Sequence, residues 1–275
     1  MLNTRQKSIV YFLSKSGKCS KMNLAKIFFR ISKDNRLGND FHFYQFVPYK
    51  YGPYSFELFH DVELLERERA ITTDSRNVSI KDAQAELPTP FTALLDEYSR
   101  LAHFDDKRLL NSVYSDYPEY TIFSKIKKKE TYNRDRTGVI PLGYEGLSID
   151  AFLMRLIREK VQTLVDVRDT PWSMKFGFKK NELSTFCDKL GIEYVGYPSL
   201  GVPNEYRKNL KTKNDYDALF RRYRRFITFK KDELKTLLEM SKNKRIALMC
   251  FEKDPECCHR TIIAEKLAEM GAEVG

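Results

Sequence analysis

The chain has 275 residues, of which 42% are hydrophobic and 31% charged, so it can bury one large core or two ordinary ones and is not a disordered polypeptide. Its 48 Lys and Arg against 38 Asp and Glu give a net charge of +10, which favours nucleic acid as a partner because basic side chains displace counterions from phosphates. A merely basic protein surface is the alternative. Five cysteines in a chain of this length, and no apolar run of membrane-spanning length, exclude a disulfide framework and a membrane partner, so we expect a cytoplasmic protein.

Residues 1–85 predict two helices, an alternating strand at 41–46, a third helix through 56–65 and a hairpin over 70–80, with Tyr-Gly-Pro just before the third helix. This order resembles a winged helix-turn-helix. It is similar to the small domains of bacterial regulators and phage-defence proteins and, more distantly, to Panacea antitoxin-type domains, which share a tyrosine-rich Tyr-Gly-Pro segment. The resemblance implies that the third helix binds duplex DNA, with Arg76 and Lys81 at the wing.

The third helix carries many acidic residues, which weakens the case for DNA binding. These residues are Glu57, Asp61, Glu63, Glu66 and Glu68. Their charge repels phosphates and suits docking to a protein about as well as duplex binding. A protein partner of the N-terminal domain is therefore the alternative.

Residues 86–137 predict a helical connector that ends in a basic run and carries no catalytic motif. Such a run is typical of a solvated linker. A nucleic-acid contact through Lys127, Lys128 and Lys129 is the sharper alternative. The third predicted domain follows, over residues 138–275.

In this last part of the chain, apolar strands alternate with helices, which indicates an α/β domain with a mostly parallel sheet and flanking helices. The strands are predicted at residues 139–144, 163–168, 192–195 and 246–249. Ser148 is expected to cap the helix after the first strand. One long basic helix is predicted from Asp215 to Met240.

Polar residues gather where two of these strands end and where the last helix begins. Asp166 and Arg168 end one strand, Glu252 follows another, and Cys258, His259 and Arg260 begin the helix. Ligands of open α/β sheets bind outside the carboxyl ends of the strands, and a helix N-terminus favours anions. If the two strands are neighbours, these groups face one hollow that fits a phosphate or a carboxylate. An ion pair that only locks the sheet edge is the alternative.

The polar and aromatic residues of this region are divided by their side-chain chemistry into candidate catalytic and candidate binding residues. The candidate catalytic residues are Asp166, Glu252, His259 and Cys258. Carboxylates and imidazole transfer protons, and a thiol at a helix N-terminus has a lowered pKa and can act as a nucleophile. The candidate substrate- or phosphate-binding residues are Arg168, Arg260, Arg207, Ser173, Tyr144 and Trp172. Guanidinium groups fit a phosphate and aromatic rings stack on a base, whereas packing in the core is the alternative for the rings.

The cluster of Cys250, Cys257, Cys258 and His259 contains soft metal ligands. Zinc sites place ligand pairs two to four residues apart with a second pair elsewhere, and here adjacent cysteines stand beside the histidine with no second cluster. We therefore expect no metal and no cofactor, and a buried structural thiol at Cys250.

An ordered set of short motifs runs through the second half of the chain. These are Leu142-Gly143-Tyr144, Ser148 with Phe152, Leu164 to Arg168 with Pro171 and Ser173, Gly191 to Tyr194, Leu200-Gly201, Cys250 with Glu252, and Cys258-His259-Arg260. With these motifs, residues 139–271 resemble the family called domain of unknown function 488. The resemblance implies an α/β sandwich with these polar residues in a shared pocket. A fainter similarity to rhodanese-type folds does not extend to sulfur transfer, because the spacing from Cys250 to Arg260 is too long for a compact phosphate loop.

These features together predict an enzyme that acts on a nucleotide or on nucleic acid, with DNA favoured over RNA. The expected reaction is hydrolysis of an N-glycosidic or phosphate ester bond, in phage defence or DNA processing. The alternative is a ligand-sensing DNA-binding regulator, whose α/β domain binds an anionic metabolite without catalysis.

Overall fold

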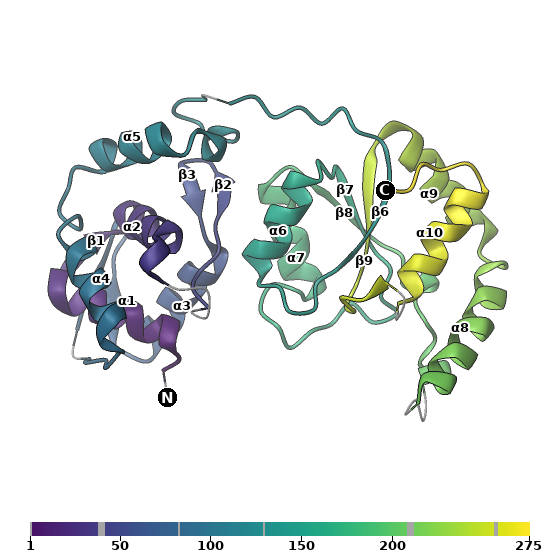
Figure 1. The fold of residues 1–275 in the computed structure, drawn as a ribbon, viewed down its shortest axis with the longest axis horizontal. Helices are drawn as coiled ribbons and strands as arrows, with labels where there is room; N and C mark the ends of the chain where they lie inside the picture. Colours follow the sequence, from purple (N-terminus) through teal and green to yellow (C-terminus); the bar gives the residue numbers. More distant parts are fainter. Residues whose placement is uncertain (1, 38–41, 82, 129, 208–211, 256–257) are drawn as a thin grey trace. The chain divides into compact units, whose positions relative to one another are not determined.

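A computed structural model describes residues 2–37, 42–81, 83–128, 130–207, 212–255 and 258–275 (Figure 1). The chain divides into two compact units, unit 1 (Met1–Tyr132) and unit 2 (Asn133–Gly275). Within the described ranges, no helix combines the length and the apolar character that crossing a bilayer requires.

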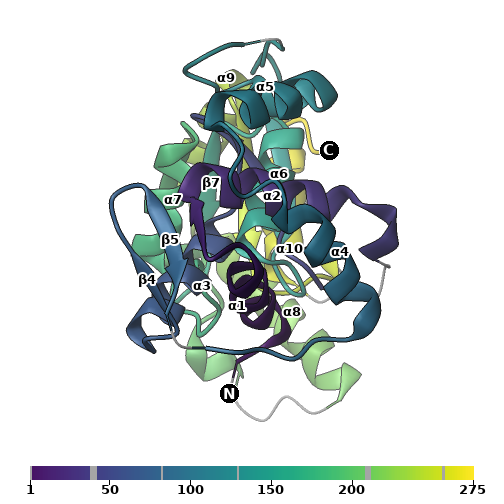
Figure 2. The ribbon, with the colours of Figure 1, turned by 90° about the vertical axis from the view of Figure 1, so that its left-hand side faces the viewer.

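Unit 1 combines helices with short antiparallel strands. Its elements are α1 (Thr4–Ser16), β1 (Lys18–Ser20), α2 (Lys21–Lys33), η1 (Asn35–Leu37), β2 (Val47–Tyr49), β3 (Gly52–Tyr54), α3 (Phe56–Arg67), β4 (Ile71–Thr73), β5 (Asn77–Ile80), α4 (Thr89–Ser99), α5 (Asp106–Asp116) and η2 (Pro118–Thr121). β4 and β5 form the predicted hairpin, and β1 pairs with the other edge of β5. In Figure 2 the hairpin lies beside α1 and α3, and α4 lies on the other side of α1. The winged-helix assignment stays a prediction.

The aromatic segment before β2 is irregular instead of the strand that its alternation predicts. Residues 42–46 carry no strand, and residue 41 lies outside the described residues. Phe43 and Tyr44 are adjacent and both buried, and Phe43 stacks on Phe28 of α2 with ring centroids 5.5 Å apart. A strand sends adjacent side chains to opposite faces, so two adjacent buried rings are better placed by an irregular backbone.

Unit 2 is the predicted α/β fold. Its elements are β6 (Gly138–Gly143), α6 (Ile149–Arg158), β7 (Thr163–Asp166), α7 (Lys180–Lys189), β8 (Glu193–Gly196), η3 (Pro198–Leu200), η4 (Asn204–Arg207), α8 (Lys213–Ile227), α9 (Lys231–Asn243), β9 (Arg245–Cys250) and α10 (His259–Glu269). The four strands pair in the order β6-β9-β7-β8, and every pairing is parallel. α6 and α7 cover one face of the sheet, and α9 and α10 cover the other (Figure 1).

Coverage on both faces explains the apolar sequence of the central strands. Every residue of β7 and of β9 is buried, as is usual for parallel strands between helices. The predicted cap of α6 is confirmed, because the side chain of Ser148 accepts a hydrogen bond from the backbone N–H of Ala151 at 3.1 Å. The sheet therefore provides a rigid frame for the residues at its carboxyl edge.

The long basic helix is two helices, α8 and α9, with a break at residues 228–230. Both contribute to one core, through Tyr223 and Ile227 of α8 and Leu234 and Leu237 of α9. A single helix over residues 215–240 would be roughly 39 Å long at 1.5 Å per residue. The six-residue β9 that it has to cover spans only roughly 20 Å. Helical periodicity continues across the break, so the sequence pattern does not reveal it.

Candidate functional site

Two strands that end in polar residues are neighbours at the carboxyl edge of the sheet. β7 pairs with β9, and Asp166 lies opposite Met249. Arg168 follows β7, whereas Cys250 ends β9 and Glu252 follows it. α10 begins at His259 in the same region. The fold therefore brings together residues that are more than 80 positions apart in the sequence.

The carboxylate of Asp166 is fully occupied by protein partners. It is 1% exposed. Its Oδ1 accepts hydrogen bonds from the backbone N–H (3.1 Å) and Nε (2.8 Å) of Arg168, and its Oδ2 accepts from Nη2 of Arg168 and the hydroxyl of Tyr194, both at 2.6 Å. Nη1 of Arg168 donates to the hydroxyl of Tyr144 at 3.0 Å. Asp166 thus orients Arg168.

These contacts keep the buried guanidinium charged. Burial disfavours the charged form, but hydrogen bonding to Asp166 and its negative charge outweigh burial and raise the pKa of Arg168. Burial and the same carboxylate raise the pKa of Tyr194, so its phenol stays protonated and donates. A guanidinium has five N–H donors, more than these side chains use, so Arg168 can also bind an anion.

A cavity of about 290 Å³ lies beside this guanidinium. Its lining residues are Tyr144, Arg168, Asp169, Thr170, Trp172, Ser173, Cys250, Phe251 and Glu252. Trp172 is 61% exposed, whereas the ring of Tyr144 is buried and stacks on Phe178 with centroids 4.1 Å apart. The hydroxyl of Ser173 accepts a hydrogen bond from the backbone N–H of Lys175 at 3.1 Å and shapes the loop. Trp172 and Phe251, which is 46% exposed, are therefore rings on which a ligand can stack.

A second group of polar side chains lies where β9 ends and α10 begins, and two of its members, Cys250 and Glu252, also line the cavity. The sulfur atoms of Cys250 and Cys258 each lie 3.0 Å from Oε2 of Glu252. They lie 3.7 and 3.9 Å from Nδ1 of His259. All four donor atoms are within 4.8 Å of one another, so these residues could hold a metal ion. We call them the Cys-Glu-His cluster.

The two thiols of the Cys-Glu-His cluster differ in acidity. Burial opposes ionisation of Cys258, but hydrogen bonds from Cys250 and His259 and the charge of His259 outweigh burial and lower the pKa of Cys258 to about 6. The hydrogen bond to Cys258, followed by burial, raises the pKa of Cys250. Burial also opposes ionisation of Glu252, but hydrogen bonds from the two thiols prevail and lower its pKa. The first proton lost by the thiol pair therefore leaves Cys258.

Arg260 lies at the same edge of the sheet but lines a separate cavity, together with Gly143, Lys253 and Pro255. It is 1% exposed, and its guanidinium donates to the carbonyl oxygens of Glu252 at 2.5 Å and Lys253 at 3.2 Å. Arg260 thus holds the loop that carries Glu252.

Two glycines of the predicted motifs permit close backbone approaches at this edge. A Cβ at Gly143 would lie 1.9 Å from the carbonyl oxygen of Glu252. A Cβ at Gly201 would lie 2.2 Å from the backbone nitrogen of Asp169. Glu252 and Asp169 both line the cavity, so the two glycines that approach them help to shape its wall.

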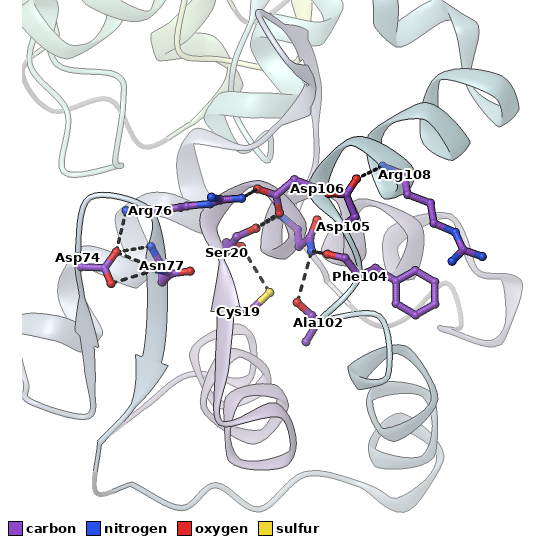
Figure 3. A network of polar contacts seen from close by, with 11 residues as sticks. Cys19, Ser20, Asp74, Arg76, Asn77, Ala102, Phe104, Asp105, Asp106 and Arg108 are labelled. Atoms are coloured by element: carbon purple, nitrogen blue, oxygen red, sulfur yellow. Dashed lines mark hydrogen bonds and ion pairs between the residues drawn. The ribbon is translucent and has the colours of Figure 1, made fainter.

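In unit 1, Arg76 belongs to a network of polar contacts (Figure 3). Asp106 at the start of α5 accepts a hydrogen bond from the hydroxyl of Ser20 at 2.6 Å and pairs with Nη2 of Arg76 at 2.7 Å. Asp74 accepts from the backbone N–H groups of Arg76 (2.7 Å) and Asn77 (2.6 Å). The network joins the β4–β5 turn to the starts of α2 and α5, and the side chain of Arg76 remains 72% exposed.

The other predicted nucleic-acid-binding residues are exposed or outside the description. Lys81, Lys127 and Lys128 are exposed, and Lys129 lies outside the described residues. The backbone of Arg207 lies in η4, but its side chain lies outside the described part of the structure, so its predicted phosphate contact stays a prediction.

The sequence places Tyr194 in one of the family motifs without a role of its own, and it does not mark Asp169, Thr170 or Phe251 as part of this region. Tyr194 lies opposite Leu164 in the pairing of β8 with β7. Leu164 and Asp166 are two residues apart on one strand, so Tyr194 shares the face of Asp166. The alternation was visible in the sequence, whereas the pairing of β7 with β8 was not. Nothing in the sequence pattern distinguished the other three.

Residues 148–267 match a family model described as Domain of unknown function DUF488. The match confirms the predicted resemblance for these residues, which run from the cap of α6 into α10, and it does not extend into unit 1. Neither a curated protein nor a solved structure matches the chain.

Proposed function

We propose that unit 2 hydrolyses a nucleotide, free or within nucleic acid, at an N-glycosidic or phosphate ester bond. The observation that carries the proposal is the charged, buried guanidinium of Arg168, which Asp166 and Tyr144 hold in one orientation at the wall of a cavity. A guanidinium fixed in this way is the group that recognises a phosphate most effectively, because its donors match two phosphate oxygens.

The rest of the cavity fits a nucleotide. Trp172 offers an exposed indole on which a base can stack, a contact worth about 1–3 kcal/mol per base. A volume of about 290 Å³ is at the low end for ligand pockets, so the cavity suits one nucleotide and not a run of several. A nucleotide within a duplex would therefore have to leave the base stack to enter.

The Cys-Glu-His cluster supplies the reactive groups in this proposal. Glu252 and Cys250 line the cavity, and Cys258 and His259 lie directly behind them. Asp166 and Arg260 have other tasks, because Asp166 positions Arg168 and Arg260 holds the loop of Glu252. Activation of the attacking water is therefore assigned to the cluster.

Unit 1 would hold the polymer when the nucleotide is part of nucleic acid, with DNA as the expected partner. Lys81, Lys127 and Lys128 are exposed cations suited to contacts with phosphates. The alternative partner of unit 1 is a protein. Part of the acidic charge of α3 is neutralised, because Glu57 pairs with Arg5 at 2.6 Å, which leaves duplex binding open.

The test incubates the full chain with labelled single- and double-stranded DNA and RNA and with free nucleotides, and measures released base and released phosphate separately. We expect one of the two products from the parent, and about 10- to 100-fold less from Arg168→Lys, which keeps the charge but loses the paired donors. Arg224→Lys, an exposed residue of α8 that pairs with Glu265, is the control and should match the parent. No product from the parent, or equal rates for Arg168→Lys and the parent, would refute the proposal.

A ligand-sensing regulator is the second candidate, and it is favoured by the full occupation of Asp166 by protein partners. A guanidinium whose paired carboxylate is fully occupied by protein partners can bind an anion without chemistry at that pair. This function predicts that a nucleotide changes the affinity of the full chain for DNA by the same factor as DNA changes its affinity for the nucleotide. Binding of both with no mutual effect would exclude it.

A further inference from the structure

The donor atoms of the Cys-Glu-His cluster converge from two elements that are joined by one short loop. Cys250 ends β9, Glu252 lies in the loop, and Cys258 and His259 begin α10. Cys250, Cys258 and His259 are each 2% exposed. Two sulfur atoms, one carboxylate oxygen and one imidazole nitrogen thus meet in a space that is largely closed to solvent.

The hydrogen bond of the imidazole indicates which nitrogen faces the cluster. Nε2 of His259 lies 2.9 Å from the carbonyl oxygen of Val167, which can only accept. Nε2 therefore carries a proton, and in the neutral ring Nδ1 presents its lone pair to the two sulfur atoms. Histidines that bind metals use one nitrogen for the metal and donate the other N–H to a carbonyl or carboxylate in this way.

With Glu252 ionised and the imidazole of His259 neutral, protons alone do not satisfy the cluster of two thiols, Oε2 and Nδ1. Each neutral thiol has one proton to donate. If both protons go to Oε2 of Glu252, Nδ1 of His259 has no donor among the cluster's own members. If one thiol donates to Nδ1, its sulfur lies 3.0 Å from Oε2 with no proton between them. A cation at the centre removes this conflict, because all four lone pairs then point at positive charge.

We propose that Cys250 Sγ, Cys258 Sγ, His259 Nδ1 and Glu252 Oε2 bind one divalent metal ion, with Zn²⁺ as the preferred ion. Four donors of this kind at bond lengths of about 2.0–2.3 Å form a tetrahedron whose donor atoms are roughly 3.3–3.8 Å apart. The separations of 3.0, 3.7 and 3.9 Å lie close to that range, and all four atoms lie within 4.8 Å of one another, so shifts of up to about 1 Å complete the site. Two thiolates and an imidazole select zinc over magnesium or calcium.

The ion would join the end of β9 to the start of α10 beside the cavity. Both thiols lose their protons to solvent on binding, so uptake of one Zn²⁺ releases the protons that they held. The sequence pattern predicts no metal here because its cysteine and histidine spacing lacks the second ligand pair of a zinc site. That spacing leaves out Glu252. In the fold, the end of β9 and the start of α10 lie together, so Cys250 and Glu252 contribute the ligands that a second pair contributes in other zinc sites.

The readout of this inference is the metal itself, so it is tested separately from the proposed hydrolysis. An ion held by all four groups would take the place of their role in activating water, whereas the role of Arg168 in binding phosphate would be unchanged. The full chain, purified under reducing conditions and stripped of metal, is equilibrated with Zn²⁺ and passed over a desalting column, and zinc per chain is measured by mass spectrometry. We expect one equivalent in the parent and in Cys187→Ser, a buried thiol of unit 2 outside the cluster. In Cys250→Ser, Cys258→Ser and His259→Ala, the affinity should fall at least about 100-fold.

A spectroscopic measurement on the parent guards against variants that fail to fold. Co²⁺ in place of Zn²⁺ should give thiolate-to-cobalt charge-transfer absorption in the parent and about half of it in either single cysteine variant. Glu252→Gln, which keeps the shape of the side chain, should weaken binding while the circular dichroism spectrum is unchanged. The absence of charge-transfer absorption from the parent, or equal zinc content in the parent and the Cys258→Ser variant, would overturn the proposal.

Cys257 lies outside the described residues and stands next to one proposed ligand in the sequence. Because Cys257 is not one of the four proposed ligands, Cys257→Ser should bind zinc as the parent does. Zinc that is lost in Cys257→Ser but kept in Cys258→Ser would overturn the assignment of Cys258.

Discussion

Each unit contains an arginine–aspartate pair of nearly the same length, yet the two pairs differ in their surroundings. Arg76 and Asp106 of unit 1 are 2.7 Å apart, and the arginine side chain is 72% exposed. Arg168 and Asp166 of unit 2 are 2.6 Å apart, and their side chains are 7% and 0% exposed. Solvent and salt screen the first pair and not the second. Distance alone therefore says little about what an ion pair does.

The difference in burial assigns different tasks to the two pairs. The exposed pair helps to hold the β4–β5 turn against α5 and contributes little energy. Hydrogen bonds with Tyr144 and Tyr194 hold the buried pair in one geometry, and Arg168 lines a cavity. A buried charge that is costly to desolvate and rigidly held is suited to bind an ion of opposite charge.

Removal of one partner of the buried pair should have the largest effect. Arg168→Ala leaves the Asp166 carboxylate buried without its cation, and we expect unit 2 to lose about 3–5 kcal/mol of unfolding free energy in urea denaturation. The double variant Asp166→Leu, Arg168→Met removes both charges and should recover most of that loss while nucleotide binding stays absent. Equal destabilisation by the single and double variants would show that the charge is not the cause.

A methyl group at Gly143 should have the next largest effect, because it tests how tightly the edge of unit 2 is packed. Its Cβ would lie 1.9 Å from the carbonyl oxygen of Glu252, so Gly143→Ala should displace this loop at a cost of about 1–3 kcal/mol. Gly196→Ala at the end of β8 is the matched control, since a Cβ there meets nothing within 4 Å. Thermal unfolding of both variants measures the difference, and similar melting temperatures would contradict the packing argument.

Unit 1 contains a buried charge of its own at Lys26, whose ammonium donates to the carbonyl of Pro53 at 2.9 Å. Burial lowers the pKa of Lys26 to about 7, from 10.5. Between these values the unfolded chain binds more protons than the folded chain, so stability from this group rises with pH by up to about 1.4 kcal/mol per unit. Hydrogen exchange of α2 amides at pH 7.0 and 8.5 should show this rise in the parent relative to Lys26→Met. Parallel pH dependence in the two proteins would contradict it.

The smallest effect is expected from the exposed pair. Arg76→Ala should change the unfolding free energy by less than about 1 kcal/mol, and the change should shrink further at 1 M salt. Urea denaturation at low and high salt measures this, with Arg168→Ala as the comparison whose effect should persist in salt. A loss in Arg76→Ala as large as that in Arg168→Ala would remove the contrast between the two units.

The sequence predicted the fold of unit 2 well, because burial on both faces leaves apolar strands that are easy to recognise. The order β6-β9-β7-β8 could not be predicted, since it depends on tertiary packing. For this reason the sequence could name Asp166, Arg168 and Glu252 together but could not say that Asp166 faces Arg168 and Tyr194.

The break between α8 and α9 shows a second limit. The apolar residues keep a helical spacing through residues 219–234, and only the length of the sheet that they cover requires the turn. Likewise, Phe43 and Tyr44 carry a strand-like composition and fill a core without pairing. Pattern predicts which residues are buried more reliably than it predicts the backbone that buries them.

The most direct test of the role of Arg168 is the affinity of the full chain for nucleoside 5′-monophosphates, measured one by one by calorimetry. The account predicts that at least one binds the parent and Arg224→Lys equally, and binds Arg168→Lys about 10- to 100-fold more weakly. Equal affinity of Arg168→Lys and the parent, or no binding of any of them to the parent, would contradict it.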